Sequence, residues 1–214
     1  MRTRGRPPDS RARILAAAAA EFAARGFDGA NVDRIARAAR LNKAMIYYHF
    51  KNKAALYGEI FRGLIEAVLD RARAIAASDA SPREQITAFV HAIVEEAEAR
   101  PHFPPMWLRE IAEGGRHLDR ATFNLVRQVP ETLNAIMERG CASGEFRRCH
   151  PLLLHFGIVG PLMLYFVSQP VRSRIASEGP STLFMVPRDQ LLAHVEHATL
   201  ATLTTGPQER GRRS

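Results

Sequence analysis

Three short segments within residues 9–50 constrain the fold most, because each combines a helix-capping residue with apolar residues at helical spacing. The first runs from a cap at Asp9 or Ser10 to a stop at Gly26. Its apolar residues recur four apart and are Ile14, Ala18 and Phe22. Such a stripe needs a partner to cover it, so this helix is expected to pack against the next two.

The second and third segments are separated by a short turn. Asn31 caps a helix whose apolar residues recur at i, i+3, i+4 and i+7, namely Val32, Ile35, Ala36 and Ala39. After Arg40 and Leu41, Asn42 caps a third helix that extends to about Phe50. Two short helices joined by a turn of three to four residues form a helix-turn-helix.

The remainder of the chain is also helical in pattern and lacks the alternation typical of strands. Ser81, Pro82 and Glu84 combine a cap, a proline in the first turn and a glutamate three residues after the cap, which is a strong helix start. Other helices are predicted at about 52–77, 104–113, 119–142, 149–169 and 188–204. We therefore predict an all-α protein.

Positive charge is concentrated in the N-terminal quarter. Residues 1–57 contain 12 Lys and Arg against 4 Asp and Glu, whereas residues 58–214 contain 18 of each kind. All three lysines lie within residues 42–53, beside two tyrosines and a histidine. A basic surplus confined to one segment indicates a polyanion as its partner, and in a helix-turn-helix that partner is double-stranded DNA.

The third helix supplies the candidates for reading DNA, because the N-terminal part of that helix reaches base edges in the major groove. The side chains expected at the bases are Lys43, Ala44, Met45 and Tyr48. Those expected at phosphates, from helix ends and flanks, are Asn31, Tyr47, His49 and Lys53, and the cap Asn42 completes the DNA-binding set. The alternative is that the tyrosines are packing residues and the lysines are merely solvated.

A known family shares these residues. The N-terminal part resembles the signature of the TetR family of bacterial transcriptional regulators. The matching residues are Gly26-Phe27, Val32, Ile35-Ala36, Ala39 and above all the Tyr-x-His-Phe-x-Asn-Lys core at 47–53. The resemblance covers about residues 10–57. It implies a homodimer with an N-terminal three-helix DNA-binding domain and a larger helical domain that binds a small effector and dimerises through its last two helices. It also implies DNA contacts for Lys43, Ala44, Tyr47, Tyr48, His49 and Lys53.

One departure from the family concerns the turn. Arg40 stands where the family usually has glycine, and a left-handed conformation there would cost the chain about 1 kcal/mol. Asn31 and Asn42 replace the commoner Ser or Thr, which cap equally well. Neither change removes a function.

Two predicted helices of the C-terminal part indicate a dimer. The helix over about 149–169 is apolar almost all round and must be covered on both sides. The helix over 188–204 offers a narrow stripe with small residues, namely Leu191, Val195, Ala198 and Thr202. Together they predict a four-helix interface between two copies and hence a palindromic operator. The alternative is that both helices lie inside a monomer.

Bulky apolar residues on separate predicted helices could surround an effector cavity: Phe89, Ile93, Trp107, Phe123, Met137, Phe156 and Met163. Possible polar anchors are Arg109, Glu110, Asn134 and His155. Plain core packing is the alternative for each of them. Such a lining favours a small, largely apolar or aromatic compound.

No cofactor or metal is expected. His194 and His197 are spaced i, i+3, and Cys149 adjoins His150, but zinc and iron sites need three or four convergent ligands. No Gly-x-Ser-x-Gly, phosphate-binding loop or HExxH is present, which disfavours an enzyme. The best candidate for a membrane span, 152–167, is too short, so we expect a cytoplasmic protein with no membrane partner.

The predicted organisation has four parts. A disordered basic arm occupies 1–8, the helix-turn-helix domain 9–57, the helical effector-binding and dimerisation domain 58–205, and a disordered tail 206–214. Arg4 and Arg6 either reach the minor groove or only solubilise the arm. The predicted function is a ligand-responsive repressor. A non-specific architectural DNA-binding protein and a helical enzyme are the alternatives.

Overall fold

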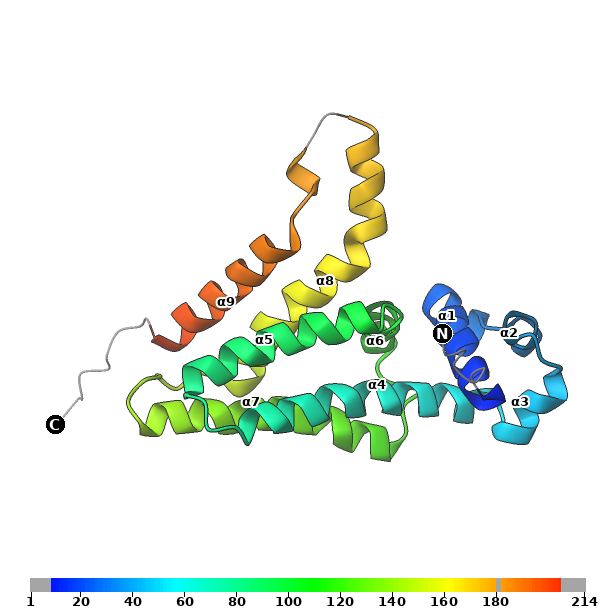
Figure 1. Cartoon of the computed structure of the whole chain (residues 1–214), viewed down its shortest axis with the longest axis horizontal. Coiled ribbons are helices and arrows are strands. Elements are labelled where there is room, and N and C mark those ends of the chain that lie inside the picture. Colours follow the sequence, from blue (N-terminus) through cyan, green and yellow to red (C-terminus); the bar gives the residue numbers. More distant parts are fainter. Residues whose placement is uncertain (1–8, 180–181, 205–214) are drawn as a thin grey trace, which may run out of the picture. The chain divides into compact units, whose positions relative to one another are not determined.

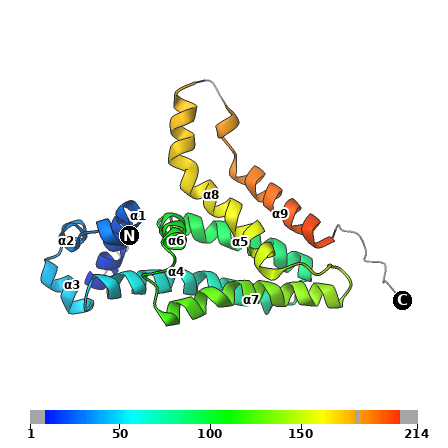
Figure 2. The same ribbon diagram turned by 180° about the vertical axis from the view of Figure 1, so that it is seen from behind.

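The computed structural model describes residues 9–179 and 182–204 (Figure 1, Figure 2). All regular elements of the described residues are helices, which confirms the predicted all-α fold. They are α1 (Ser10–Gly29), α2 (Val32–Ala39), α3 (Lys43–His49), α4 (Lys53–Ala76), α5 (Pro82–Ala99), α6 (Phe103–Ala112), α7 (Arg120–Ala142), α8 (Pro151–Ser177), a 3₁₀ turn η1 (Thr182–Phe184) and α9 (Arg188–Thr204). The predicted N-terminal arm, with Arg4 and Arg6, and the predicted tail lie outside the described residues.

The chain divides into two compact units, and α4 contributes to both. Among the described residues, the first unit holds 9–65 and 102–123, and the second holds 66–101 and 124–204. The domain boundary predicted at residue 57 follows the order of the chain. The first unit differs from the predicted domain because it also includes α6 and the segment after it, and α6 packs on α1.

The first unit starts with the three helices of the helix-turn-helix. Each has the cap that the sequence predicts: Asp9 accepts from Arg11 N–H, Asn31 from Asp33 and Arg34 N–H, and Asn42 from Met45 N–H. The residues that fill the core between these helices are almost fully buried and are Ile14, Ala18, Phe22, Ile35, Ile46 and Phe50. Burial of this size holds short helices that would be marginal alone.

Gly26 breaks α1 where the sequence predicts a stop. Its φ is 69°, inside the left-handed region, and a Cβ built there would lie 2.9 Å from both Cδ and Nη1 of Arg109. The Arg109 guanidinium donates to the Phe22 carbonyl oxygen at 3.3 Å. Glycine is therefore required at this position both for the backbone conformation and for the close approach of α6.

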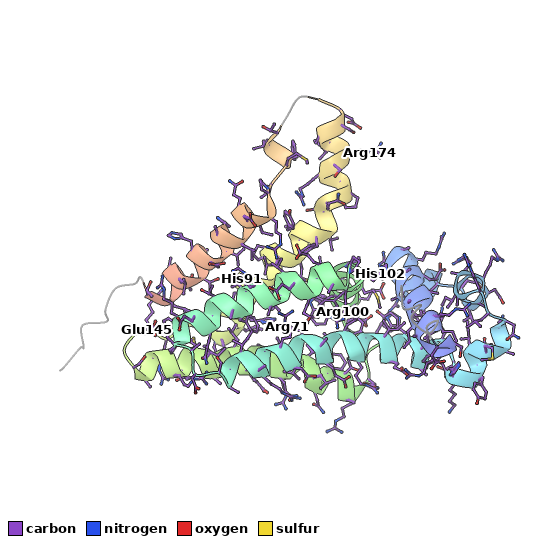
Figure 3. The ribbon with its side chains drawn as sticks, in the orientation of Figure 1. Arg71, His91, Arg100, His102, Glu145 and Arg174 are labelled. Atoms are coloured by element: carbon purple, nitrogen blue, oxygen red, sulfur yellow. The ribbon has the colours of Figure 1, made fainter. Side chains whose placement is uncertain are left out.

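The second unit contains α5, α8 and α9, together with parts of α4 and α7. Ser81 and Glu84 form the predicted capping box, with Pro82 in the first turn of α5. An ion pair and a hydrogen bond link the helices. Arg71 of α4 lies 3.3 Å from Glu96 of α5, and His91 Nε2 of α5 is 2.6 Å from Glu196 Oε1 of α9. Arg71 and His91 are labelled in Figure 3.

The helix α8 is longer than the sequence predicts, and its expected end at 169 is wrong. It continues through Pro161 and Pro170 to Ser177, and Figure 1 shows it bent along its length. An interior proline removes one backbone hydrogen bond and bends a helix, but it does not always end one. By length and composition α8 could cross a membrane, a property it shares with core helices of globular proteins.

Candidate nucleic-acid interface

The helix α3 is anchored on one side and open on the other. Ile46 and Phe50 are 1% and 3% exposed and hold α3 against α1 and α2, whereas Tyr48 is 80% exposed and Tyr47 49% exposed. A side chain that is four-fifths exposed makes little contact with the protein core. The packing alternative therefore fails for Tyr48, and Tyr47 is about half covered.

The two asparagine caps use their side-chain oxygens within the domain. The amide oxygen of Asn31 accepts from Asp33 N–H at 2.7 Å, and that of Asn42 accepts from Met45 N–H at 2.9 Å. Both side chains are exposed. A phosphate contact from either residue would have to come from its NH₂ group, because that group is the donor of the amide.

Lys43 lies at the start of α3, where a base-reading residue is expected, and Ala44 beside it is exposed. The Lys43 ammonium donates to Asp33 of α2 at 3.0 Å, and this hydrogen bond raises the pKa of Lys43. Both side chains are about half exposed, so the pair is weak and readily exchanged for another acceptor. The pair links the start of α3 to α2 across the helix-turn-helix.

Lys53 and His49 both reach back to α1. The Lys53 ammonium donates to the carbonyl oxygens of Phe27 at 2.9 Å and Ala30 at 3.3 Å, and it lies 4.5 Å from the centre of the Phe27 ring. His49 Nε2 is 2.8 Å from Ser10 Oγ. An ammonium has three donors, so Lys53 can bind these carbonyls and still offer one hydrogen to a phosphate. The sequence did not indicate this second, structural role.

A buried polar cluster that the sequence analysis did not predict lies under the DNA-binding helices of the same unit. The Tyr57 hydroxyl donates to Glu110 Oε2 at 2.7 Å, and the His117 backbone N–H donates to Glu110 Oε1 at 2.9 Å. Burial and then the bond to Glu110 raise the pKa of the Tyr57 phenol, so it stays a donor. The sequence signal was the Gly114-Gly115 pair, whose chain reversal returns His117 to α6.

The seven residues expected around an effector cavity do not share one unit. Trp107 and Phe123 belong to the first unit, and the other five belong to the second. Phe89, Ile93, Met137 and Met163 are buried there, but Phe156 is 57% exposed, and Phe123 is 47% exposed with its ring against Gly115. The predicted grouping of all seven is therefore not found within either unit, because α6 packs with the DNA-binding helices.

Of the four predicted polar anchors, two are used in the first unit and two are unpaired in the second. Arg109 binds the Phe22 carbonyl and Glu110 joins the buried cluster. Asn134 Oδ1 on α7 and His155 Nδ1 on α8 are buried and have no hydrogen-bond partner among residues 9–179 and 182–204. Burial lowers the pKa of His155 to about 4, so its imidazole is neutral at pH 7.

Comparison with known proteins agrees with this geometry. Residues 14–60 match the family described as bacterial regulatory proteins, tetR family, and residues 82–183 match the tetracyclin repressor-like C-terminal domain. The transcriptional repressor KstR2 of Mycolicibacterium smegmatis is 30% identical over 153 residues, which are 68% of this chain and 71% of that protein. The chain belongs to the TetR family. The two family matches together span residues from both parts of the chain.

Two further proteins resemble this TetR-family chain to different extents. The transcriptional repressor SCO4008 of Streptomyces coelicolor is 48% identical over 60 residues, which are 28% of this chain and 29% of that protein. The solved structure of the ketosteroid transcriptional regulator KstR2 of Mycobacterium tuberculosis superposes with a TM-score of 0.71 at 23% identity, covering 96% of this chain and 100% of that one. The latter likeness shows the fold alone.

The chain is accordingly a DNA-binding transcriptional regulator of the TetR family. The family and the relatives named above are regulators, which disfavours both the enzyme and the non-specific architectural alternatives. The roles assigned to single residues of α3 remain predictions.

Proposed function

We propose that this regulator is a dimeric repressor that binds a palindromic operator and is released by a small, largely apolar effector. The observation that carries the proposal is the open face of α3, on which Tyr48 is 80% exposed beside the exposed Lys43 and Ala44. A helix entering the major groove presents such a face to base edges.

The side chains of α3 differ in what they can read. Lys43 can donate to guanine O6 or N7, whereas Ala44, Met45 and Tyr48 can contact a thymine methyl group. Tyr47, His49, Lys53 and the NH₂ groups of Asn31 and Asn42 lie at helix ends and flanks, where phosphates pass. Sequence choice is therefore assigned to the first group and affinity to the second.

An exposed apolar face on α8 supports the dimer. Its members recur at helical spacing and are Leu153, Phe156, Leu164 and Val171. Gly157 and Gly160 fall on the same face, and nothing lies within 4 Å of a Cβ built at either. A second copy can approach closely over these glycines and cover the apolar residues, which also explains an apolar helix in a cytoplasmic protein.

The second unit offers an effector both apolar contacts and hydrogen bonds. Phe89 and Ile93 of α5 and Met163 of α8 are buried, and α5 packs on α8. The unpaired atoms of Asn134 and His155 are available to a polar group of a ligand. Because the His155 imidazole is neutral, it suits a hydroxyl or carbonyl better than a carboxylate. These features together favour an apolar compound that carries one such polar group.

Release follows from differential affinity. An effector that binds more tightly to a conformation with α4 tilted would favour that conformation. The distance between the two recognition helices would then no longer match the spacing of the half-sites, and DNA affinity would fall. An effector with equal affinity for both conformations would change nothing.

Binding-site selection tests the proposal. The purified full chain, exposed to a pool of random duplexes, is expected to retain palindromes with half-sites about one helical turn apart. Lys43→Ala should change the preferred bases at one position of each half-site, with a loss of about 1–3 kcal/mol at the original base pair. Arg83→Ala, on the exposed start of α5, is the matched control and should select the same sequences as the unmodified chain.

Two outcomes contradict the proposal. Retention of duplexes without a shared sequence would show binding without reading. Identical preferences in the Lys43→Ala variant and the unmodified chain would remove Lys43 from the reading face.

A further inference from the structure

We propose that Glu110, Glu113 and His117 form a binding site for a divalent transition-metal ion of the zinc class. One ligand atom from each residue lies within 4.8 Å of the other two. His117 Nδ1 is 3.2 Å from Glu110 Oε2 and 3.3 Å from Glu113 Oε2. Tetrahedral zinc with ligands at about 2.0–2.2 Å sets neighbouring ligand atoms roughly 3.3–3.5 Å apart, so two of the three edges are already close to the required length.

The charge of the cluster points independently to a cation. The Glu110 side chain is 2% exposed, and in the described part of the chain its only ionic partner within 4.0 Å is His117. Buried carboxylates are hydrogen-bonded, paired with cations or bound to metals. Glu110 accepts hydrogen bonds from Tyr57 and from the His117 backbone N–H, and a cation would add to these contacts. A divalent ion bound here would be coordinated by oxygens of Glu110 and Glu113 and by the ring nitrogen Nδ1 of His117.

The surroundings hold the three ligands in place. Gly114 and Gly115, with φ of 74° and 76°, reverse the chain after α6, so that the backbone N–H of His117 reaches Glu110 Oε1. Tyr57 donates to Glu110 Oε2, and the His117 ring lies against Phe27 with ring centres 4.3 Å apart. Such supporting bonds orient metal ligands and increase their affinity.

The site is accessible from solvent on one side. Glu113 is 28% exposed and His117 11% exposed, so an ion could reach the ligands from solvent. Arg116 Nη2 is 3.4 Å from Glu113 Oε2 but 2.6 Å from Asp28, so its main partner is Asp28 and Glu113 can turn to an ion.

The sequence analysis expected no metal because it considered His194 with His197, and Cys149 with His150. The three ligands proposed instead are spaced Glu-x-x-Glu-x-x-x-His, with two left-handed glycines between the second and third. Only the chain reversal brings them together. A bound ion would tie the end of α6 to α4 and α1 of the same unit, through Tyr57 and Phe27.

The site is tested by isothermal titration calorimetry, in which Zn²⁺ is titrated into the full chain after its metal ions have been removed with EDTA and the EDTA has been dialysed away. We expect about one ion per chain, with binding at least about tenfold weaker in Glu113→Gln and His117→Gln and about 10–100-fold weaker in Tyr57→Phe, which removes only a supporting bond. His194→Gln, on the exposed face of α9, is the matched control and should bind Zn²⁺ as the unmodified chain does. Co²⁺ in place of Zn²⁺ should give the visible absorption of a four-coordinate ion.

The proposal is overturned if the chain takes up no Zn²⁺, or if Glu113→Gln and His117→Gln bind it as tightly as the unmodified chain. Loss of binding in His194→Gln alone would assign the ion to surface histidines and also overturn it. Far-UV circular dichroism, together with DNA binding measured in EDTA, shows whether the variants are folded. These measurements also separate a failed metal site from a failed repressor.

Discussion

Arg40 adopts a strained backbone conformation in the turn of the helix-turn-helix. Among the described residues it is the one non-glycine residue with positive φ, at 54°, and it caps the C-terminus of α2. Its backbone N–H donates to the carbonyl oxygens of Ala36 and Arg37, which end the helix in a left-handed conformation that favours glycine. The resemblance to the TetR family predicts this strain, because the family usually has glycine where this chain has Arg40.

We expect Arg40→Gly to raise the free energy of unfolding by about 1 kcal/mol, because glycine adopts this conformation without the Cβ clash. Arg37→Gly, an equal change at an exposed position inside α2, should lower the free energy of unfolding by about 1 kcal/mol. Urea denaturation of both variants measures the difference. A destabilised Arg40→Gly variant would mean that the arginine side chain contributes more than its backbone costs.

Other residues could be predicted only in part. The caps Asn31, Asn42 and Ser81 act as the sequence predicts, because a cap bonds to N–H groups two or three residues away. Lys43 and Lys53 were predicted as DNA contacts, but their bonds to Asp33 and to the Phe27 carbonyl were not. Long side chains choose among partners that only the tertiary fold brings near.

At the scale of the helix, α8 combines a predicted feature with an unpredicted one. Its apolar composition on all sides was evident from the sequence, and the structure leaves one face open with Leu153, Leu164 and Val171 exposed. The sequence did not predict that α8 extends to Ser177. The predicted end at about 169 lies just before Pro170, but an interior proline can be accommodated by a bend. The remaining helix ends agree within a few residues where a cap or a glycine marks them.

If the proposed dimer forms through this face, we expect Leu164→Glu to yield a monomer, because a carboxylate there cannot be buried against a second copy without a partner. Ile111→Glu introduces the same charge at a similarly exposed apolar residue on α6 and should leave the dimer intact. Sedimentation equilibrium at micromolar concentration measures the mass of each variant. An unchanged dimer in Leu164→Glu would place the interface elsewhere.

At the scale of the whole molecule, the division into two units was the least predictable feature. The contacts that join α6 to the first unit pair residues distant in the chain, such as Arg109 with Gly26 and Glu110 with Tyr57. No local sequence pattern predicts such pairs, and Trp107 and Glu110 were therefore expected among the effector-binding residues. The sequence did predict that charge, and hence the DNA partner, belongs to the N-terminal quarter.

The central claim is that the basic first unit grips the DNA backbone while the open face of α3 reads the bases. Fluorescence anisotropy of the full chain with its selected operator and with a random duplex, between about 50 and 200 mM salt, tests this most directly. If the protein neutralises six or more phosphates, operator affinity is expected to fall by roughly a thousandfold over that range. If Tyr48 reads bases, Tyr48→Ala is expected to lower operator affinity toward that of the random duplex. Affinity that hardly changes with salt, or operator preference that survives Tyr48→Ala intact, would contradict it.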